Sequence, residues 1–424
     1  MIECEGVNYL GIIPSGKETN PADIFFVQVD KTKCIECGTC SEYCPTTAIR
    51  PSNGNDGPRE VVHPGLCINC GQCLIHCPAG AIYETVSYID EIFDAINNPN
   101  KYTVAVPAPA IRYALSECFG YSPGTCTYGK MVTALRELGF DKVWDNQFTA
   151  DLTIMEEGTE LLKRITGEID RPLPQFTSCC PAWIKYVETF YPELLPHISS
   201  CKSPIGMAAA AARVYGAKEA GINPNQMYFV SIMPCIAKKF EGLRPEIVGI
   251  DATITTRELA YMLKSKKIDF QKLPESKTDP IMGVSSGAGT IFAATGGVTE
   301  AALRFLYWKI SGEKKEKINF KVVRGLKGIK EATIKLPKKI KTINGETDTI
   351  KVAVASGVRY ARVLCDQVKK GTSPYHFIEV MACPGGCVCG GGEPILPGVR
   401  EAVEMTLKRW YGGLKKRIKD TQEV

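Results

Sequence analysis

Eight cysteines near the N-terminus stand in two runs with the same spacing, Cys-x2-Cys-x2-Cys-x3-Cys-Pro. This spacing is typical of sites that hold two 4Fe–4S clusters. The short gaps let one tight loop direct three thiolates at one cluster, and the fourth cysteine of each run binds the other cluster. The runs predict one cluster on Cys34, Cys37, Cys40 and Cys77, and a second on Cys67, Cys70, Cys73 and Cys44.

The alternative for these cysteines is a pair of zinc knuckles or a set of free thiols. Two matching runs, closed by Pro45 and Pro78, make that alternative the weaker one. The pattern indicates electron transfer, and it does not identify the reaction that uses the electrons.

Further cysteines follow apolar, strand-like runs in three distant parts of the chain: Cys179 with Cys180, Cys235, and Cys383 with Cys387. Ligands of open α/β sheets gather outside the carboxyl ends of the strands, so these three loops could converge on one site. Four thiolates at one site would suit a third 4Fe–4S cluster. Any one of these cysteines taken alone would more often be a buried structural thiol.

The composition changes along the chain. Residues 1–26 form a leader, residues 27–88 are dense in Cys, Gly and Pro, and residues 89–424 alternate between strand-like and helical patterns. This alternation predicts an α/β domain with mainly parallel sheets. The expected strands are Tyr102–Ala108, Lys142–Asp145, Gln175–Ser178, Gln226–Met233, Lys351–Ala355 and His376–Met381. The expected helices include Leu152–Ile165, Ile184–Tyr191, Ile205–Ala220, Thr256–Lys264 and Val298–Ile310.

The chain has 424 residues, of which 44% are hydrophobic and 23% charged, as expected of a globular protein. No apolar run is long enough for a membrane span, and Met1–Lys17 lacks a signal-peptide pattern. Because the cytosol keeps thiols reduced, 19 cysteines predict a cytoplasmic metalloprotein. The net charge of +5 does not imply nucleic acid, and the basic stretch Lys309–Lys341 is interpreted as solvated surface rather than a dock for an acidic partner.

The three cysteine loops resemble the signature loops of FeFe-hydrogenases. They read Thr-Ser-Cys-Cys-Pro-Ala-Trp from Thr177, Met-Pro-Cys-Ile-Ala-Lys-Lys from Met233, and Met-Ala-Cys-Pro-Gly-Gly-Cys from Met381, followed by Gly-Gly-Gly-Glu-Pro from Gly390. The resemblance extends from about Cys34 to Pro394. It implies a small α+β ferredoxin-like domain with two 4Fe–4S clusters, followed by a two-lobed α/β domain that encloses the active-site cluster.

The resemblance also implies the ligands of that active-site cluster. Cys180, Cys235, Cys383 and Cys387 would hold a 4Fe–4S cube, and Cys387 would bridge it to a diiron unit that carries CO, cyanide and a dithiolate. The Lys238 ammonium is suited to pair with a cyanide. Backbone contact with the cyanides and soft apolar walls would come from Ala108, Pro109, Ala110, Met233 and Met381.

Splitting H2 requires a base close to the metal and a path for the proton to water. By resemblance, Cys179 is the proton donor and acceptor, and Glu157, Ser199, Glu160 and Arg164 follow it. Glu157, Glu160 and Arg164 would share one face of a helix. On spacing alone, an ordinary surface charge pattern would be the better interpretation.

We therefore expect a reversible hydrogenase that takes H2 and protons as substrates and exchanges electrons with ferredoxin or a similar carrier. Maturation enzymes would insert the diiron unit. The alternatives are an H2 or redox sensor, a non-catalytic iron–sulfur assembly protein, and a plain electron-transfer protein. Departures from the family pattern, among them Ile236, Ile205 and Cys389, make the pocket less polar but remove no ligand.

Overall fold

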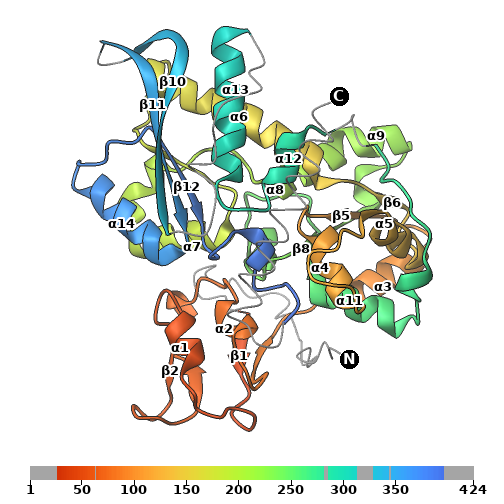
Figure 1. Cartoon of the computed structure of the whole chain (residues 1–424). Coiled ribbons are helices and arrows are strands. Elements are labelled where there is room, and N and C mark those ends of the chain that lie inside the picture. The colour runs from red at the N-terminus through yellow and green to blue at the C-terminus, as the bar shows by residue number, and fades with distance from the viewer. Residues whose placement is uncertain (1–25, 63, 281–284, 313–327, 343–344, 396–424) are drawn as a thin grey trace. The chain divides into compact units, whose positions relative to one another are not determined.

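The computed structural model describes residues 26–62, 64–280, 285–312, 328–342 and 345–395, and the chain divides into two compact units (Figure 1). The first unit comprises Met1–Asn146, Ala208–Val284 and Val388–Val424. The second comprises Gln147–Met207 and Ser285–Cys387. The predicted leader 1–26 lies, apart from Phe26, outside the described residues.

The N-terminal part of the first unit contains two antiparallel strand pairs, β1 with β4 and β2 with β3. Its helices α1 and α2 each follow a glycine in the left-handed conformation, Gly38 with φ 76° and Gly71 with φ 70°. The repeated cysteine runs thus fold into repeated loop–helix units. The elements are β1 (Val27–Val29), α1 (Thr39–Tyr43), β2 (Ile49–Pro51), β3 (Arg59–Val61), α2 (Gln72–Ile75) and β4 (Ile82–Glu84).

The core beneath these short elements is completed from elsewhere in the first unit. Ile236 and Phe240 pack, fully or almost fully buried, among Phe26, Leu74 and Ile82. So small a region has few apolar side chains of its own, and the two borrowed residues enlarge its core.

A parallel sheet with the order β6-β5-β8-β9 forms the centre of the rest of the first unit. Helices α3, α4, α5, α10 and α11 surround it (Figure 1). The strands are β5 (Tyr102–Pro107), β6 (Lys142–Val143), β8 (Met227–Met233) and β9 (Ala252–Thr255). The helices are α3 (Ile89–Asn97), α4 (Ile111–Glu117), α5 (Tyr128–Glu137), α10 (Ala237–Gly242) and α11 (Thr256–Ser265).

The second unit is built on a sheet with the order β10-β11-β12-β7. Strands β11, β12 and β7 run parallel, and β10 pairs antiparallel with β11 as a long hairpin. The strands are β7 (Gln175–Phe176), β10 (Ile329–Thr342), β11 (Gly345–Ser356) and β12 (Phe377–Met381). The helices are α6 (Asn146–Thr166), α7 (Pro181–Phe190), α12 (Gly287–Ile291), α13 (Gly297–Ser311) and α14 (Val358–Lys369). Helices α13 and α14 pack against the strands from opposite sides (Figure 1).

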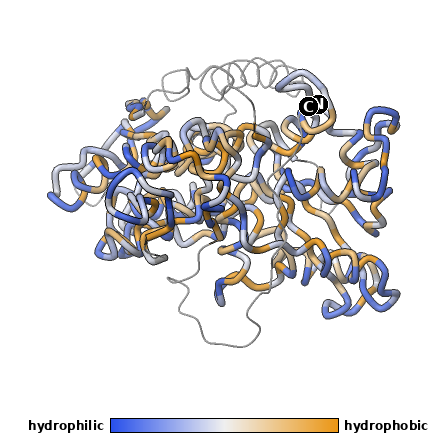
Figure 2. The backbone as a smooth tube through the Cα atoms, turned by 90° about the horizontal axis from the view of Figure 1, so that it is seen from below, coloured by the Kyte–Doolittle hydropathy of each residue, from blue (hydrophilic) through white to orange (hydrophobic). Residues whose placement is uncertain are grey.

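The predicted α/β class with mainly parallel sheets is confirmed, and the predicted strands and helices are present with shifted ends, except for the helix at Ile205–Ala220. Hydrophobic segments gather in the interior, as parallel strands covered on both faces require (Figure 2). No helix among the described residues is both long enough and apolar enough to cross a membrane.

Two predicted elements differ from the structure. The helix expected at Ile205–Ala220 is divided into α8 (Pro204–Ala211), a π-helical turn (Ala212–Gly216) and α9 (Ala217–Ala220). Gly216 lies in that turn against the Trp144 ring, where a Cβ would come within 2.4 Å of a ring carbon. The strand expected at Lys351–Ala355 begins at Gly345, because it pairs from there with β10, the strand that lies in the basic stretch.

A buried carboxylate joins β12 to α13. Glu379 is fully buried and accepts hydrogen bonds from the backbone N–H of Gly296 (2.6 Å) and of Thr299 (2.7 Å). Gly296 directly precedes α13, and Thr299 lies in its first turn. The N–H groups at a helix N-terminus have no acceptor within the helix, and this end of the helix attracts negative charge.

Replacing Glu379 by Gln should therefore lower the free energy of unfolding by about 1–3 kcal/mol, because an amide offers one acceptor oxygen for two buried donors. Chemical denaturation followed by circular dichroism measures this difference. Glu346→Gln, at an exposed position on β11, is the control. Equal stability of the two variants would show that the Glu379 contacts contribute nothing.

Candidate active site

Four cysteines of the first predicted cluster line one cavity in the ferredoxin-like region. The cavity is lined by Cys34, Cys37 and Cys40 of the first run and by Cys77 of the second. The structure thus brings the crossed-over fourth cysteine to the set to which the sequence assigned it. Among the described residues, no group of three or more Cys, His, Asp or Glu side chains lies close enough together to hold a single metal ion.

The remaining four cysteines also lie close together. Burial raises the pKa of the Cys73 thiol well above its usual value, and the nearby Cys70, Cys67 and Cys44 thiols raise it further. A bound metal would stabilise crowded, buried thiols of this kind as thiolates. This second set therefore also has the composition expected for a cluster.

In the second unit, two parallel strands bring their cysteine loops to one edge of the sheet. Cys179 and Cys180 follow β7, and Cys383 follows its neighbour β12. The loop after β12 is fixed by a hydrogen bond from Gly385 N to Ser356 Oγ at 2.9 Å. Cys179 and Cys383 are buried, and Cys180 and Cys387 are half-buried.

Gly386 holds the Cys383–Cys387 loop close to a neighbouring backbone. Its φ is 98°, and a Cβ would lie 2.7 Å from the Thr295 nitrogen and 3.0 Å from the Ala293 oxygen. Only glycine fits both the conformation and the space. Met381, predicted as a wall of the cofactor pocket, is buried at the end of β12.

The first unit supplies the remaining cofactor residues at the carboxyl ends of β5 and β8. Cys235 is buried directly after β8, and the chain after β5 enters the turn Ala108–Pro109–Ala110. A hydrogen bond from Ala108 N to Ile232 O (2.9 Å) joins the two strand ends. Met233 is buried at the last position of β8.

Two neighbouring lysines on α10 have different surroundings. The Lys238 side chain is only 12% exposed and forms an ion pair with Glu241 on the next turn, so it is not an ordinary surface lysine. The Lys239 side chain is fully buried, and its Nζ lies 2.8 Å from Glu84 Oε2 and 2.9 Å from Glu258 Oε2. Sequence reasoning singled out Lys238, whose role remains a prediction, and did not anticipate the buried ion pairs of Lys239.

Helix α6 presents Glu157 to the loop that carries Cys179. Glu157 is fully buried, and its Oε1 accepts a hydrogen bond from the backbone N–H of Ser178 at 3.4 Å. Among the described residues, its other oxygen, Oε2, meets no hydrogen-bond partner. Burial raises the pKa of Glu157 to about 8, although the Ser178 amide opposes the rise. This carboxyl can therefore hold and release a proton near neutral pH.

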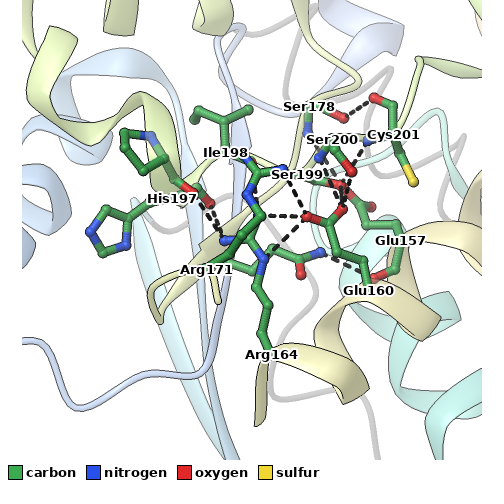
Figure 3. Close-up of polar contacts among 12 residues, drawn as sticks. Glu157, Glu160, Arg164, Arg171, Ser178, His197, Ile198, Ser199, Ser200 and Cys201 are labelled. Atoms are coloured by element: carbon green, nitrogen blue, oxygen red, sulfur yellow. Dashed lines mark hydrogen bonds and ion pairs between the residues drawn. The ribbon is translucent and has the colours of Figure 1, made fainter. Parts of the chain in front are cut away.

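Glu160, one helical turn later, has the opposite electrostatic environment (Figure 3). Burial would raise its pKa, but Arg164 donates to its Oε1 from Nη2 at 2.6 Å and keeps the pKa below the ordinary value. The Ser199 hydroxyl donates to Glu160 Oε2 at 2.9 Å. Ser199 lies beside β7, because its backbone N–H donates to Phe176 O at 2.8 Å.

Arg164 holds this arrangement together. Besides Glu160, its fully buried guanidinium donates to the backbone carbonyls of Pro172, Pro196, His197 and Ile198 at 2.8–3.3 Å. A guanidinium does not lose its proton in a protein, so these contacts make Arg164 a positioning residue for Glu160 rather than a proton carrier.

Two further residues around Glu160 escaped sequence reasoning. Ser200 donates to Oε2 from its backbone nitrogen at 2.9 Å and from its hydroxyl at 3.0 Å. Arg171 reaches Oε1 at 3.4 Å. The adjacency of Ser200 to Ser199 was a usable signal, whereas Arg171 lies beyond the end of α6 and had none.

The raised pKa of Glu157 has a consequence for stability. Between its ordinary value of 4.5 and about 8, the folded state keeps a proton that the unfolded chain has lost, so the folded state loses stability as the pH rises through this window. Glu157→Gln should therefore gain stability relative to the parent protein over the window, by up to about 1.4 kcal/mol per pH unit. Chemical denaturation at a series of pH values measures the gain, and the exposed neighbour Glu156→Gln is the control. The same pH dependence in both variants would contradict the assignment.

Two protein families match the chain. The family described as "Iron only hydrogenase large subunit, C-terminal domain" matches residues 101–391. The "4Fe-4S dicluster domain" matches residues 33–82. The chain therefore carries two 4Fe–4S clusters and an H-cluster, in which a 4Fe–4S cube is bridged to a diiron unit.

Similar proteins agree with this assignment. The chain is 55% identical over 98% of its length to the periplasmic Fe hydrogenase large subunit of Nitratidesulfovibrio vulgaris, of which it covers 97%. It is 44% identical over 86% of its length to iron hydrogenase 1 of Clostridium pasteurianum, of which it covers 64%. A solved structure of FeFe-hydrogenase HydA1 from Chlamydomonas reinhardtii superimposes with a TM-score of 0.67 and 38% identity, over 78% of this chain and 88% of that one.

The predicted cytoplasmic location is wrong, because the relative with 55% identity is a periplasmic protein. Thiolates bound to iron are protected from disulfide formation in an oxidising compartment as well as in a reducing one, so the cysteine count did not identify the compartment.

The active-site loops, the twin cysteine runs and these similarities lead to one assignment. The chain is an enzyme that oxidises H2 and reduces protons. It belongs to the family of iron-only, or FeFe-, hydrogenases.

Proposed function

We propose that this hydrogenase binds the 4Fe–4S cube of its H-cluster through Cys180, Cys235, Cys383 and Cys387, and moves protons through Cys179 and the buried residues of α6. The observation that carries the proposal is the arrangement at the end of β7, where Cys180 and Cys179 are adjacent and Glu157 is hydrogen-bonded to the neighbouring residue Ser178. At the end of β7, a proposed metal ligand and a thiol thus lie close to a carboxyl group that α6 supplies.

The donor set fits the cofactor. All four proposed ligands are thiolates, the donors that iron–sulfur clusters require, and each follows a parallel strand at its carboxyl end. When bound, the H-cluster supplies the metal site at which H2 is formed or split. The two ferredoxin-type clusters are proposed on the sets Cys34, Cys37, Cys40, Cys77 and Cys67, Cys70, Cys73, Cys44.

The proposed proton path runs from Cys179 to Glu157, Ser199 and Glu160. Glu157 can carry the proton because its pKa of about 8 is close to ambient pH. Ser199 can both donate and accept, and its hydroxyl already donates to Glu160. Arg164 lowers the pKa of Glu160, so Glu160 would hold a proton only briefly and release it readily at the far end of the path.

The remaining cofactor residues would bind the diiron unit through non-covalent contacts. The Lys238 ammonium would pair with a cyanide, and the Ala108–Pro109–Ala110 turn would offer backbone N–H groups. Met233 and Met381, both buried at strand ends, would form polarisable walls of the cofactor pocket.

We propose domain boundaries at 1–26, 27–88 and 89–424 for the leader, the ferredoxin-like domain and the catalytic domain.

The partners follow from this chemistry. Electrons would pass to or from ferredoxin or a similar carrier through the two N-terminal clusters, and maturation enzymes would deliver the diiron unit. The "large subunit" relative named above is periplasmic, which supports a periplasmic location and a subunit partner. The sensing and non-catalytic alternatives are not favoured beside hydrogenase relatives of 55% and 44% identity.

The role of Cys179 predicts a specific defect. Cys179→Ala should retain all clusters but lose most H2 evolution and uptake, because the first proton-transfer group is missing. Iron content and the infrared bands of CO and CN measure cofactor loading, and gas evolution measures turnover. Cys365→Ala, which removes a buried thiol on α14, is the control. Turnover at the parental rate in a fully loaded Cys179→Ala enzyme would exclude the proposed relay.

The role of Lys238 predicts a defect of binding rather than of chemistry. Lys238→Ala should keep the three 4Fe–4S clusters and lose much of the diiron unit, because one charge-assisted contact is gone. The infrared CO and CN bands, compared with the iron content, measure this loss. Lys264→Ala, at an exposed position of α11, should be fully loaded. Full diiron occupancy in Lys238→Ala would refute the assignment.

A further inference from the structure

A buried arginine lines the cavity of the first cysteine set in the ferredoxin-like region. Arg59, on β3, is only 7% exposed and shares this cavity with Cys34, Cys37, Cys40 and Cys77. A charged side chain is rarely buried without a partner of opposite charge, because burial removes its hydration. We therefore expect Arg59 to have a negatively charged partner in or beside this cavity.

The protein itself satisfies little of this guanidinium. Its Nη2 donates to the backbone carbonyl of Glu36 at 3.4 Å, which is a long contact. Among the described residues, Arg59 forms no ion pair, and its buried Nε meets no hydrogen-bond acceptor. The adjacent carboxylate, Glu60, pairs instead with Lys31 at 3.0 Å. A positive charge and an N–H group thus remain available to a negatively charged group in the cavity.

The charge of Arg59 acts on the cysteines of this set. A hydrogen bond with Thr39 lowers the pKa of the Cys37 thiol, and Arg59 lowers it further. Burial raises the pKa of the Cys40 thiol, and Arg59 is among the groups that oppose this rise. In both cases Arg59 stabilises negative charge on sulfur. A 4Fe–4S cluster gains negative charge when it is reduced, so the same field favours its reduction.

The second cysteine run has a different neighbour at the equivalent position. Gly38 and Gly71 occupy the same place in the two runs, each with a positive φ. A Cβ on Gly38 would lie 3.2 Å from Arg59 Nη2, whereas a Cβ on Gly71 would lie 2.6 Å from the Cδ1 atom of the buried Ile236. One ligand loop thus faces a guanidinium and the other an aliphatic side chain. At the second set, burial and neighbouring thiols raise the pKa of Cys73, so negative charge is disfavoured there.

We propose that Arg59 raises the reduction potential of the first ferredoxin-type cluster above that of the second. The proposal rests on the ligand sets proposed above. Net charge and hydrogen bonds to sulfur help to set the potential of an iron–sulfur cluster, and Arg59 offers both. On reduction, one electron enters the cluster, from H2 oxidised at the H-cluster or from a chemical reductant, and no bond forms or breaks. Arg59 takes up no proton with it, because a guanidinium is already protonated.

Arg59→Gln tests the proposal in the fully loaded, full-length protein. Loss of the charge should lower the potential of the first cluster, so that its ratio of reduced to oxidised form at a fixed potential falls about tenfold, equal to about 59 mV for a one-electron couple. The potential of the second cluster should change much less. A redox titration followed by electron paramagnetic resonance measures both couples. Arg59→Lys retains the charge and should retain most of the difference between the clusters.

Arg50→Gln is the matched control. Arg50 is exposed on β2, the partner strand of β3, and its guanidinium donates to Thr47 O at 3.0 Å and to Thr47 Oγ1 at 3.2 Å. This variant removes the same charge from the same region without changing the lining of the cavity. Both potentials should stay near the parental values. An equal shift in Arg50→Gln and Arg59→Gln would reduce the effect to net charge and overturn the proposal.

A second measurement uses the parent protein and needs no substitution. In protein grown with arginine that carries ¹⁵N in its guanidinium group, pulsed electron paramagnetic resonance should detect a ¹⁵N nucleus coupled to the reduced first cluster. If Arg59→Gln fails to hold its iron, this measurement decides. Absence of the coupling, or an unshifted couple in a loaded Arg59→Gln protein, would overturn the role of Arg59.

The ligand assignment is checked separately with Cys34→Ser, which should alter the same couple as Arg59→Gln. A response of the other couple would contradict the proposed ligand set, and the proposal with it. The expected response to Cys34→Ser beside an unshifted Arg59→Gln would overturn only the role of Arg59.

Discussion

The structure depends on parallel strands whose carboxyl ends lead into the cysteine loops proposed to bind the H-cluster. A parallel pair directs both of its chain exits to one edge, so residues far apart in sequence arrive together. β7 and β12 do this for Cys180 and Cys383, and β5 and β8 do it for the Ala108 turn and Cys235. The tight glycine loop at Gly386 and the buried carboxylate of Glu379 help to fix the loops that follow these strands.

Buried charge is used in two different ways beside these strand ends. Glu160 and Glu379 accept several hydrogen bonds each and remain fixed. Glu157 has a raised pKa and one oxygen that no described residue hydrogen-bonds, so it is the carboxyl that can change its protonation state. The difference arises from partners, not from depth, because Glu157 and Glu379 are both fully buried.

The sequence predicted the α/β class, which the structure confirms, because that class depends on local periodicity. The ligand sets assigned from the cysteine spacing remain predictions. The sequence did not predict contacts that depend on tertiary neighbours. Nothing in two adjacent lysines indicates that Lys239 would be buried between Glu84 and Glu258. The π-helical turn near Gly216 depends on the Trp144 ring, and the early start of β11 depends on its hairpin partner.

The shared core around Ile236 and Phe240 has a consequence for how the chain can be divided. The ferredoxin-like region resembles a separable electron-transfer unit, but part of its apolar interior comes from residues that follow Cys235. Excising residues 27–88 would leave that interior incomplete and would expose two large side chains on the remaining protein. The two parts of the first unit therefore depend on each other for their apolar interior.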